Sequence, residues 1–151
     1  MENRLEKELG RLCREYAACS VEVERRDEAR KVKNALENVC GRARQRQDIS
    51  DPALLIALLD AYEVTRDEVM LQEVLDVVSR NLDRLAVSAE SVKLLAYCYY
   101  YVEEKECAER AWEMMAVLER RGEDVSEVRK VLEELTELCG LSVGGGVGDD
   151  F

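Results

Sequence analysis

The stretches DPALLIALLDAY at residues 51–62 and SAESVKLLAYCY at residues 88–99 decide the fold of this chain. Each begins with a residue that caps helices, Asp51 or Ser88, and continues with apolar residues spaced three and four apart, as one face of an α-helix requires. Pro52 suits the first helical position, because the N–H group that proline lacks would have no partner there. Both stretches are therefore predicted to be helices that start directly after the capping residue.

The composition of the whole chain also favours helices. Its 151 residues include one proline, and five of its eight glycines lie in the last dozen residues. Hydrophobic residues make up 47% of the chain and charged residues 36%, which supplies a core and a solvated surface and excludes a disordered chain. We therefore expect an all-α protein of one domain.

The 3.6-residue period of the apolar residues predicts about seven helices. They are expected near residues 4–18, 21–46, 52–63, 66–84, 89–102, 105–121 and 125–139, with Gly41 as a candidate break in the second. Short turns make consecutive helices antiparallel. The predicted architecture is a right-handed stack of hairpins at about 3–47, 51–86 and 88–122, closed by a capping helix at 124–140. A single domain is expected over 1–142, and residues 143–151 are expected to form a flexible tail.

Further helix starts and ends are marked by local motifs. Capping-box spacings are present at the pairs Asn3 and Glu6, Thr65 and Glu68, and Asp124 and Glu127. Gly122 and Gly140 stand where helices are expected to stop, since glycine readily adopts the left-handed conformation of a helix end.

The two middle hairpins match each other at an offset of 37 residues. The matched pairs are Asp51 and Ser88, Leu55 and Val92, Leu58 and Leu95, Leu59 and Ala96, Tyr62 and Tyr99, Leu71 and Ala108, Leu75 and Trp112, and Val78 and Met115. A lone hairpin buries only one side of its apolar surface, so repeated hairpins stack. An ordinary antiparallel bundle would also produce some of these matches, because the helical period creates coincidences.

The hairpin at 89–122 resembles a tetratricopeptide repeat. The residues that carry the resemblance are the pair Leu95 and Ala96, then Tyr99, Ala108 and Trp112. They follow the family's order of an apolar and a small residue, an aromatic, a small residue and an aromatic. The preceding hairpin departs from that pattern at Leu59, Leu71 and Val78, where the family has small residues. The resemblance implies a superhelix that binds a peptide or protein on the inner face of its first helices.

Four of the six tyrosines lie in the stretch Tyr-Cys-Tyr-Tyr-Tyr at residues 97–101. If the apolar residues of this helix face the core, its tyrosines and one lysine turn toward another face. In the tetratricopeptide repeats that face lines the concave groove, so the resemblance implies that it binds the partner. The predicted binding residues are Lys93, Tyr97, Tyr100 and Tyr101. The alternative is that Tyr97 and Tyr101 pack against the next helix, as aromatic stripes do.

Basic residues concentrate between residues 25 and 46. One interpretation is a site for RNA or another polyanion that includes Arg42, Arg44 and Arg46. The other is a solvated helix face whose charge is balanced by acidic residues elsewhere. No aromatic residue interrupts the basic run, so stacking of bases has no platform there.

The chain as a whole is acidic, with a net charge of −11 that is unevenly distributed. Residues 1–50 carry a net charge of +2 and residues 51–151 a net charge of −13. The acidic part repels phosphates, so nucleic acid is not the expected partner, and a protein segment of basic character suits it better.

Several function classes are not expected. The chain has no histidine, no C-x-x-C pair and no glycine-rich phosphate loop before a helix, so we predict no enzyme, no metal and no cofactor. No apolar run of membrane-spanning length and no signal peptide are recognisable, so a cytoplasmic protein without membrane contact is expected. The six cysteines are interpreted as small buried hydrophobes in a reducing compartment.

These observations predict a scaffold or adaptor that binds a protein segment on a concave, acidic, tyrosine-containing face. One alternative is a helical-bundle subunit of a larger assembly, in which Tyr97 and Tyr101 would be fully buried. A less favoured alternative is RNA binding through the basic second helix. Self-association is also expected, because terminal repeats have no neighbour.

Overall fold

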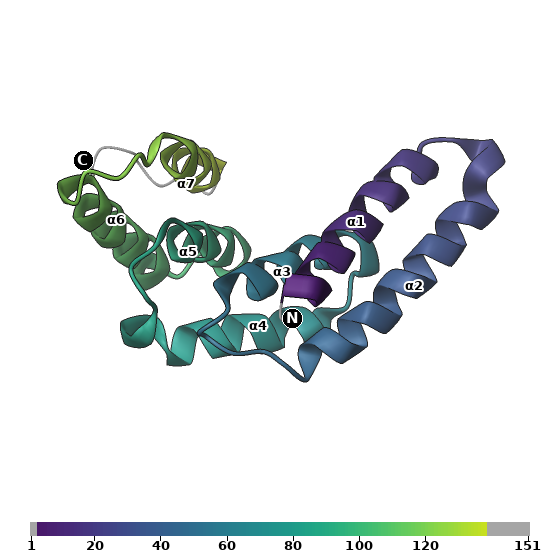
Figure 1. The fold of residues 1–151 in the computed structure, drawn as a ribbon, viewed down its shortest axis with the longest axis horizontal. Helices are drawn as coiled ribbons and strands as arrows, with labels where there is room; N and C mark the ends of the chain where they lie inside the picture. Colours follow the sequence, from purple (N-terminus) through teal and green to yellow (C-terminus); the bar gives the residue numbers. More distant parts are fainter. Residues whose placement is uncertain (1–2, 139–151) are drawn as a thin grey trace. The chain divides into compact units, whose positions relative to one another are not determined.

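The computed structural model describes residues 3–138, and within them the chain forms seven α-helices and two short 3-10 helices, with no β-strand (Figure 1). The α-helices are α1 (Asn3–Ser20), α2 (Arg26–Arg44), α3 (Pro52–Thr65), α4 (Glu68–Arg80), α5 (Ala89–Val102), α6 (Lys105–Arg120) and α7 (Ser126–Leu138); the 3-10 helices are η1 (Val23–Arg25) and η2 (Leu82–Arg84). The predicted all-α fold with seven helices is confirmed. In the same range, every helix is too short or too polar to cross a membrane.

The chain divides into two compact units, Met1–Val77 and Val78–Phe151, with the boundary inside α4. The apolar residues of α4 keep their helical period across the boundary between Val77 and Val78, so the sequence gives no sign of it. The single domain over 1–142 stays a prediction, and the tail predicted at 143–151 lies outside the described residues.

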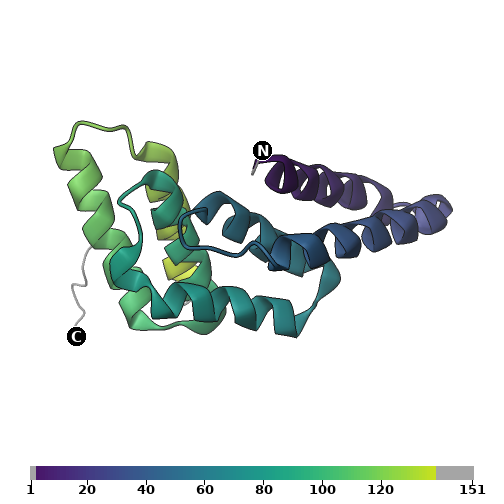
Figure 2. The same ribbon diagram turned by 60° about the horizontal axis from the view of Figure 1, so that its bottom comes forward.

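In the first unit α1 and α2 form an antiparallel hairpin, and α3 packs against both of them (Figure 2). Its centre is made of leucines with no exposed surface, namely Leu9, Leu36, Leu55, Leu58 and Leu59. Burying one leucine side chain stabilises a fold by roughly 1.5–3 kcal/mol, so these residues hold the three helices together. Removing the Leu36 side chain would leave a cavity that costs about 2–5 kcal/mol.

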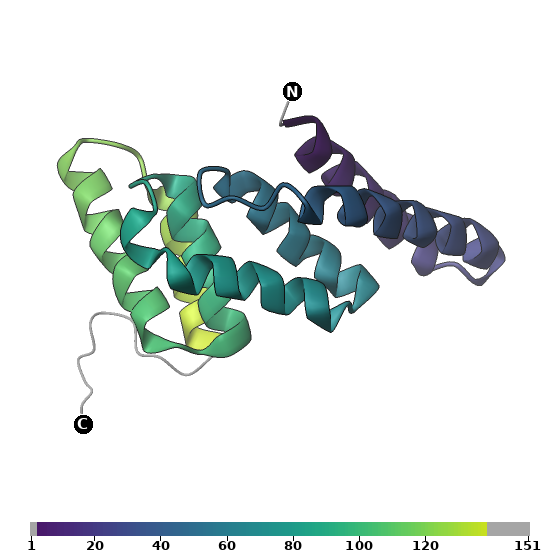
Figure 3. The ribbon, with the colours of Figure 1, turned by 90° about the horizontal axis from the view of Figure 1, so that it is seen from below.

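In the second unit α5 packs against both α6 and α7 (Figure 3). Leu94 and Leu95 of α5 are fully buried, as are Met114 of α6 and Leu132 of α7. Because α5 contacts two helices, two of its faces are apolar. Only a narrow strip of this helix remains for residues with exposed surface. That strip holds the tyrosines discussed below.

Two of the predicted helix caps are present. The Asp51 carboxylate accepts a hydrogen bond from the backbone N–H of Leu54 at 3.3 Å, with Pro52 at the start of α3. The Ser88 hydroxyl accepts one from the N–H of Ser91 at 3.1 Å. Each bond satisfies a donor that the helix itself cannot pair.

The predicted capping box of Thr65 and Glu68 is wrong. Thr65 is the last residue of α3, and α4 is capped by Asp67, whose carboxylate accepts from the N–H groups of Val69 at 3.1 Å and Met70 at 3.2 Å. An aspartate two or three residues before these donors reaches them more directly than Thr65 does.

The second helix is shorter than predicted and does not break at its glycine. Residues 21–25 form a turn and η1, so α2 begins at Arg26, and it then runs through Gly41. Val21 and Val23 are 79% and 73% exposed. The turn contains neither proline nor glycine. The predicted helix was therefore placed from the spacing of apolar residues alone, and it included the residues of the turn.

The offset of 37 residues also relates the bounds of the helices. Pro52–Thr65 and Ala89–Val102 have the same length and differ by 37 at both ends, and α4 and α6 start 37 residues apart. After α3 and α5 the chain turns through a left-handed residue, Arg66 with φ 55° and Glu103 with φ 56°. The first helices of the two hairpins therefore share their length, a side-chain N-cap and the turn that ends them, whereas α4 has 13 residues and α6 has 16.

Candidate functional site

The tyrosine face is a strip of α5 that we define by Lys93, Tyr97, Tyr100 and Tyr101. The apolar residues between them, Val92, Leu95, Ala96, Cys98 and Tyr99 among others, are buried. Tyr100 is 42% exposed, and the other three side chains of the face are half-buried. The helical period thus separates this strip from the core of the second unit.

Two aromatic contacts organise the tyrosine face. The Lys93 ammonium lies over the Tyr97 ring, 5.8 Å from its centre, a cation–π contact that stabilises by about 0.5–1 kcal/mol at an exposed site. The rings of Tyr100 and Tyr101 meet edge to face, with centres 5.2 Å apart and planes at 75°. The rings therefore have defined orientations within a single helix, which limits the side-chain entropy that a bound partner would have to remove.

Acidic residues stand at both ends of the tyrosine face. Glu90 precedes it by one helical turn, and Glu103 and Glu104 follow it; all three are exposed. Residues 78–138 contain nine Lys or Arg and fourteen Asp or Glu. The described part of the second unit is thus acidic.

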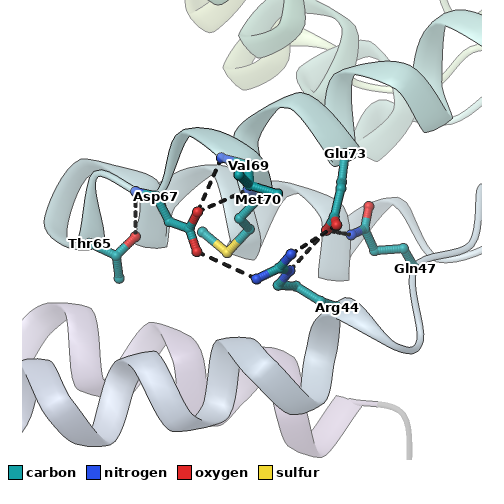
Figure 4. A network of polar contacts seen from close by, with 7 residues as sticks. All are labelled: Arg44, Gln47, Thr65, Asp67, Val69, Met70 and Glu73. Carbon is teal, nitrogen blue, oxygen red and sulfur yellow. Dashed lines mark hydrogen bonds and ion pairs between the residues drawn. The ribbon is translucent and has the colours of Figure 1, made fainter.

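The three arginines predicted as a polyanion site have different surroundings. Arg44 is the part-buried centre of a network at the end of α2 (Figure 4). Its Nε and Nη2 donate to the two carboxylate oxygens of Glu73 at 2.9 and 2.8 Å, and its Nη1 lies 3.5 Å from Asp67. Because two carboxylates already hold this guanidinium, Arg44 links the end of α2 to the start of α4 and offers little to an external anion.

The pKa shifts of the two ion-pair partners, Arg44 and Glu73, both favour their charged forms. The hydrogen bond from Arg44 lowers the pKa of Glu73, and the same bond raises the pKa of Arg44. The amide of Gln47 donates to Glu73 at 3.3 Å, while Asp67 combines its contact with Arg44 and the cap of α4. Figure 4 shows Asp67 and Glu73 on either side of the Arg44 guanidinium, with Gln47 bonded to Glu73.

Arg42 and Arg46 have a different environment. Arg42 is 62% exposed and lies 3.7 Å from the carboxylate of Glu8 on α1, and Arg46 is exposed just beyond the end of α2. Both line a hollow that also contains Arg4. The sequence did not predict Arg4 as part of this group, because Arg4 precedes Arg42 by 38 positions and Arg46 by 42. The antiparallel pairing of α1 with α2 brings the three arginines to the same hollow (Figure 1).

Neither a metal-binding cluster nor a reactive cysteine is present in the described part of the chain. Groups of three or more histidine, cysteine, aspartate or glutamate side chains that could hold a metal are absent from residues 3–138. Cys19, Cys40, Cys98 and Cys107 are buried thiols, and Cys13 is half-buried. Burial raises the pKa of Cys40 to about 12 and that of Cys107 to about 11. A thiol with so high a pKa is protonated at neutral pH and is a poor nucleophile.

The resemblance to the tetratricopeptide repeats stays a prediction, since it rests on the spacing of five residues and on the shared geometry of two hairpins. No protein-family model, no curated protein and no solved structure matches this chain.

Proposed function

We propose that this protein is a non-enzymatic interaction module that binds a basic protein segment on the tyrosine face of α5. The observation that carries the proposal is the exposure pattern of this helix. Tyr100 is exposed and Tyr97 and Tyr101 are half-buried on a helix whose other faces are almost entirely buried. Tyrosines with accessible ring area are enriched in binding surfaces, because they bury much area with few rotamers to lose.

The charge of the second unit supports the choice of partner. A basic segment would be attracted by the acidic residues at both ends of the tyrosine face, and the rings would then contribute contact area. The 37-residue offset between the helix starts and between the left-handed residues Arg66 and Glu103 supports a repeat architecture of the tetratricopeptide type, in which such a face receives an extended or helical peptide.

The alternative of a bundle subunit without a binding face requires Tyr97 and Tyr101 to be fully buried. Both rings retain exposed surface, which favours the interaction module. RNA binding through α2 is disfavoured as well, because the Arg44 guanidinium is held by Glu73 and Arg42 lies near the carboxylate of Glu8.

The test is an affinity capture from the source cells with the wild type and with a Tyr97→Ala/Tyr101→Ala variant. We expect the variant to lose a specific protein that the wild type holds, and raised salt to weaken the wild-type complex. Tyr16→Ala is the matched control, because Tyr16 is a half-buried tyrosine of the first unit. Circular dichroism of each variant verifies that it is folded. Retention of the same proteins by wild type and double variant would refute the proposal.

A further inference from the structure

In the first unit, side chains near the start of α1 and the end of α2 line a hollow of about 670 Å³. It is lined by Arg4, Leu5, Glu8, Arg42, Gln45 and Arg46. On α1 the lining residues Arg4 and Glu8 are one helical turn apart, so that helix presents one face to the hollow, whereas Arg42 lies in the last turn of α2 and Gln45 and Arg46 directly follow its end. The antiparallel hairpin is what joins these two groups of residues.

The charge inside this hollow is positive. Its lining contains three arginines and one acidic residue, Glu8, so the lining side chains carry a net charge of +2. Among the described residues, the lining contains one ion pair, the long contact of Arg42 with Glu8 at 3.7 Å. At that distance the pair is weak, and Arg42 keeps donors that an anion can use.

The lining also restricts what kind of anion fits. Guanidinium groups bind the oxygens of phosphoryl groups through paired N–H donors, and Gln45 adds a neutral amide. The volume falls in the range of small-molecule sites, but Leu5 is the one apolar residue of the lining, so a charged ligand suits it. None of the lining residues is aromatic, so bases of a nucleic acid have nothing to stack on.

From this arrangement we infer that the hollow binds a small ligand with two or more phosphoryl charges, held by Arg4, Arg42 and Arg46. Glu8 competes with the ligand for Arg42. This hollow belongs to the first unit and the tyrosine face to the second, so it would supply a second binding activity.

The experiment is a calorimetric titration of the full chain with inorganic tripolyphosphate, which has the charge of the inferred ligand and no base. We expect saturable binding below about 1 mM at low salt. Arg42→Gln and Arg46→Gln should each weaken it about fivefold or more, because each removes a charged donor pair. The matched control is Arg120→Gln/Arg121→Gln, two exposed arginines of the second unit, which should leave binding unchanged.

Glu8→Gln gives the most discriminating result. It removes the competing carboxylate, so it should strengthen tripolyphosphate binding, by about threefold for a partly exposed pair. A purely structural role of the Glu8–Arg42 contact predicts no such gain. The inference is overturned by absence of saturable binding, by equal loss in the Arg120→Gln/Arg121→Gln control, or by no gain in Glu8→Gln. It is also overturned if single-stranded RNA binds the same arginines more tightly than tripolyphosphate does.

Discussion

Arg66 and Glu103 occupy the same place in two successive hairpins, 37 residues apart, and both have a left-handed backbone. Each ends a helix of fourteen residues by donating its N–H to a tyrosine carbonyl four residues earlier, Tyr62 at 2.8 Å and Tyr99 at 2.7 Å. These are the only non-glycine residues with positive φ in the range 3–138. The conformation is required by the short turn, since one left-handed residue reverses the chain with few residues.

Replacing Glu103 with glycine should stabilise the protein. The left-handed conformation costs a residue with a Cβ atom about 1–2 kcal/mol, and the greater unfolded-state entropy of glycine offsets part of the gain. We expect Glu103→Gly to raise the free energy of unfolding by about 0.5–1 kcal/mol, measured by urea denaturation. Glu103→Ala should show no gain, and Lys130→Gly, inside α7, should lose about 1 kcal/mol. A loss of stability in Glu103→Gly would contradict this account of the turn.

The cap of α4 should depend on Asp67 rather than on Thr65. Asp67→Ala removes the acceptor of two N–H groups and the contact with Arg44, so it should destabilise by about 1–2 kcal/mol. Asp67→Asn keeps a capping oxygen and should cost less, and Thr65→Ala should cost less than either aspartate variant. Hydrogen exchange at the Val69 and Met70 amides reports the cap directly. Faster exchange at these amides in Thr65→Ala than in Asp67→Ala would show that the wrong residue has been assigned.

The contact between Arg44 and Glu73 should make stability depend on pH. The pKa of Glu73 in the folded chain is lowered from its ordinary value of 4.5. Its contribution is therefore complete above pH 4.5 and is lost as the pH falls through the lower, folded value. A double-mutant cycle with Arg44→Gln and Glu73→Gln should give a coupling of about 0.5–1 kcal/mol at pH 7, modest because both side chains are partly exposed. The coupling should shrink toward zero at acidic pH, and a coupling that grows as the pH falls would have the wrong sign.

The buried thiols should be unreactive in the folded protein. Burial raises the pKa of Cys98 and of Cys107, whereas Cys13 keeps some exposed surface. At pH 8 a thiol reagent should modify Cys13 about tenfold faster than Cys98 or Cys107, as judged by mass spectrometry of digested samples. Denaturant should remove the difference. Equally fast modification of Cys98 in the native protein would mean that the interface of α5 and α6 opens readily.

Sequence reasoning worked where the cause of a structure is local. The caps at Asp51 and Ser88 and the separation of the tyrosine strip from the core follow from helix geometry and side-chain chemistry alone. The turn before α2 was missed because no proline or glycine marks it. Left-handed Arg66 and Glu103 gave no signal either, since neither residue type prefers that conformation.

Long-range pairings could not be predicted from the linear pattern. Arg44 and Glu73 are 29 positions apart, and nothing in the sequence distinguishes Arg44 from its basic neighbours. Only the packing of α2 near the start of α4 gives Arg44 a structural role. The same holds for Arg4, which joins Arg42 and Arg46 through the hairpin.

The central claim is that the tyrosine face binds a protein partner, and site-specific photo-crosslinking tests it most directly. A photoreactive phenylalanine analogue placed at Tyr100, the most exposed ring of the face, should form a covalent adduct with one specific protein in the source cells. The same analogue at Glu109, exposed on α6, should not form that adduct. A specific adduct from the Tyr100 position, lost in the Tyr97→Ala/Tyr101→Ala background, is the predicted result. Adduct formation from Glu109 alone, or an adduct from Tyr100 that persists in the double variant, would contradict the claim.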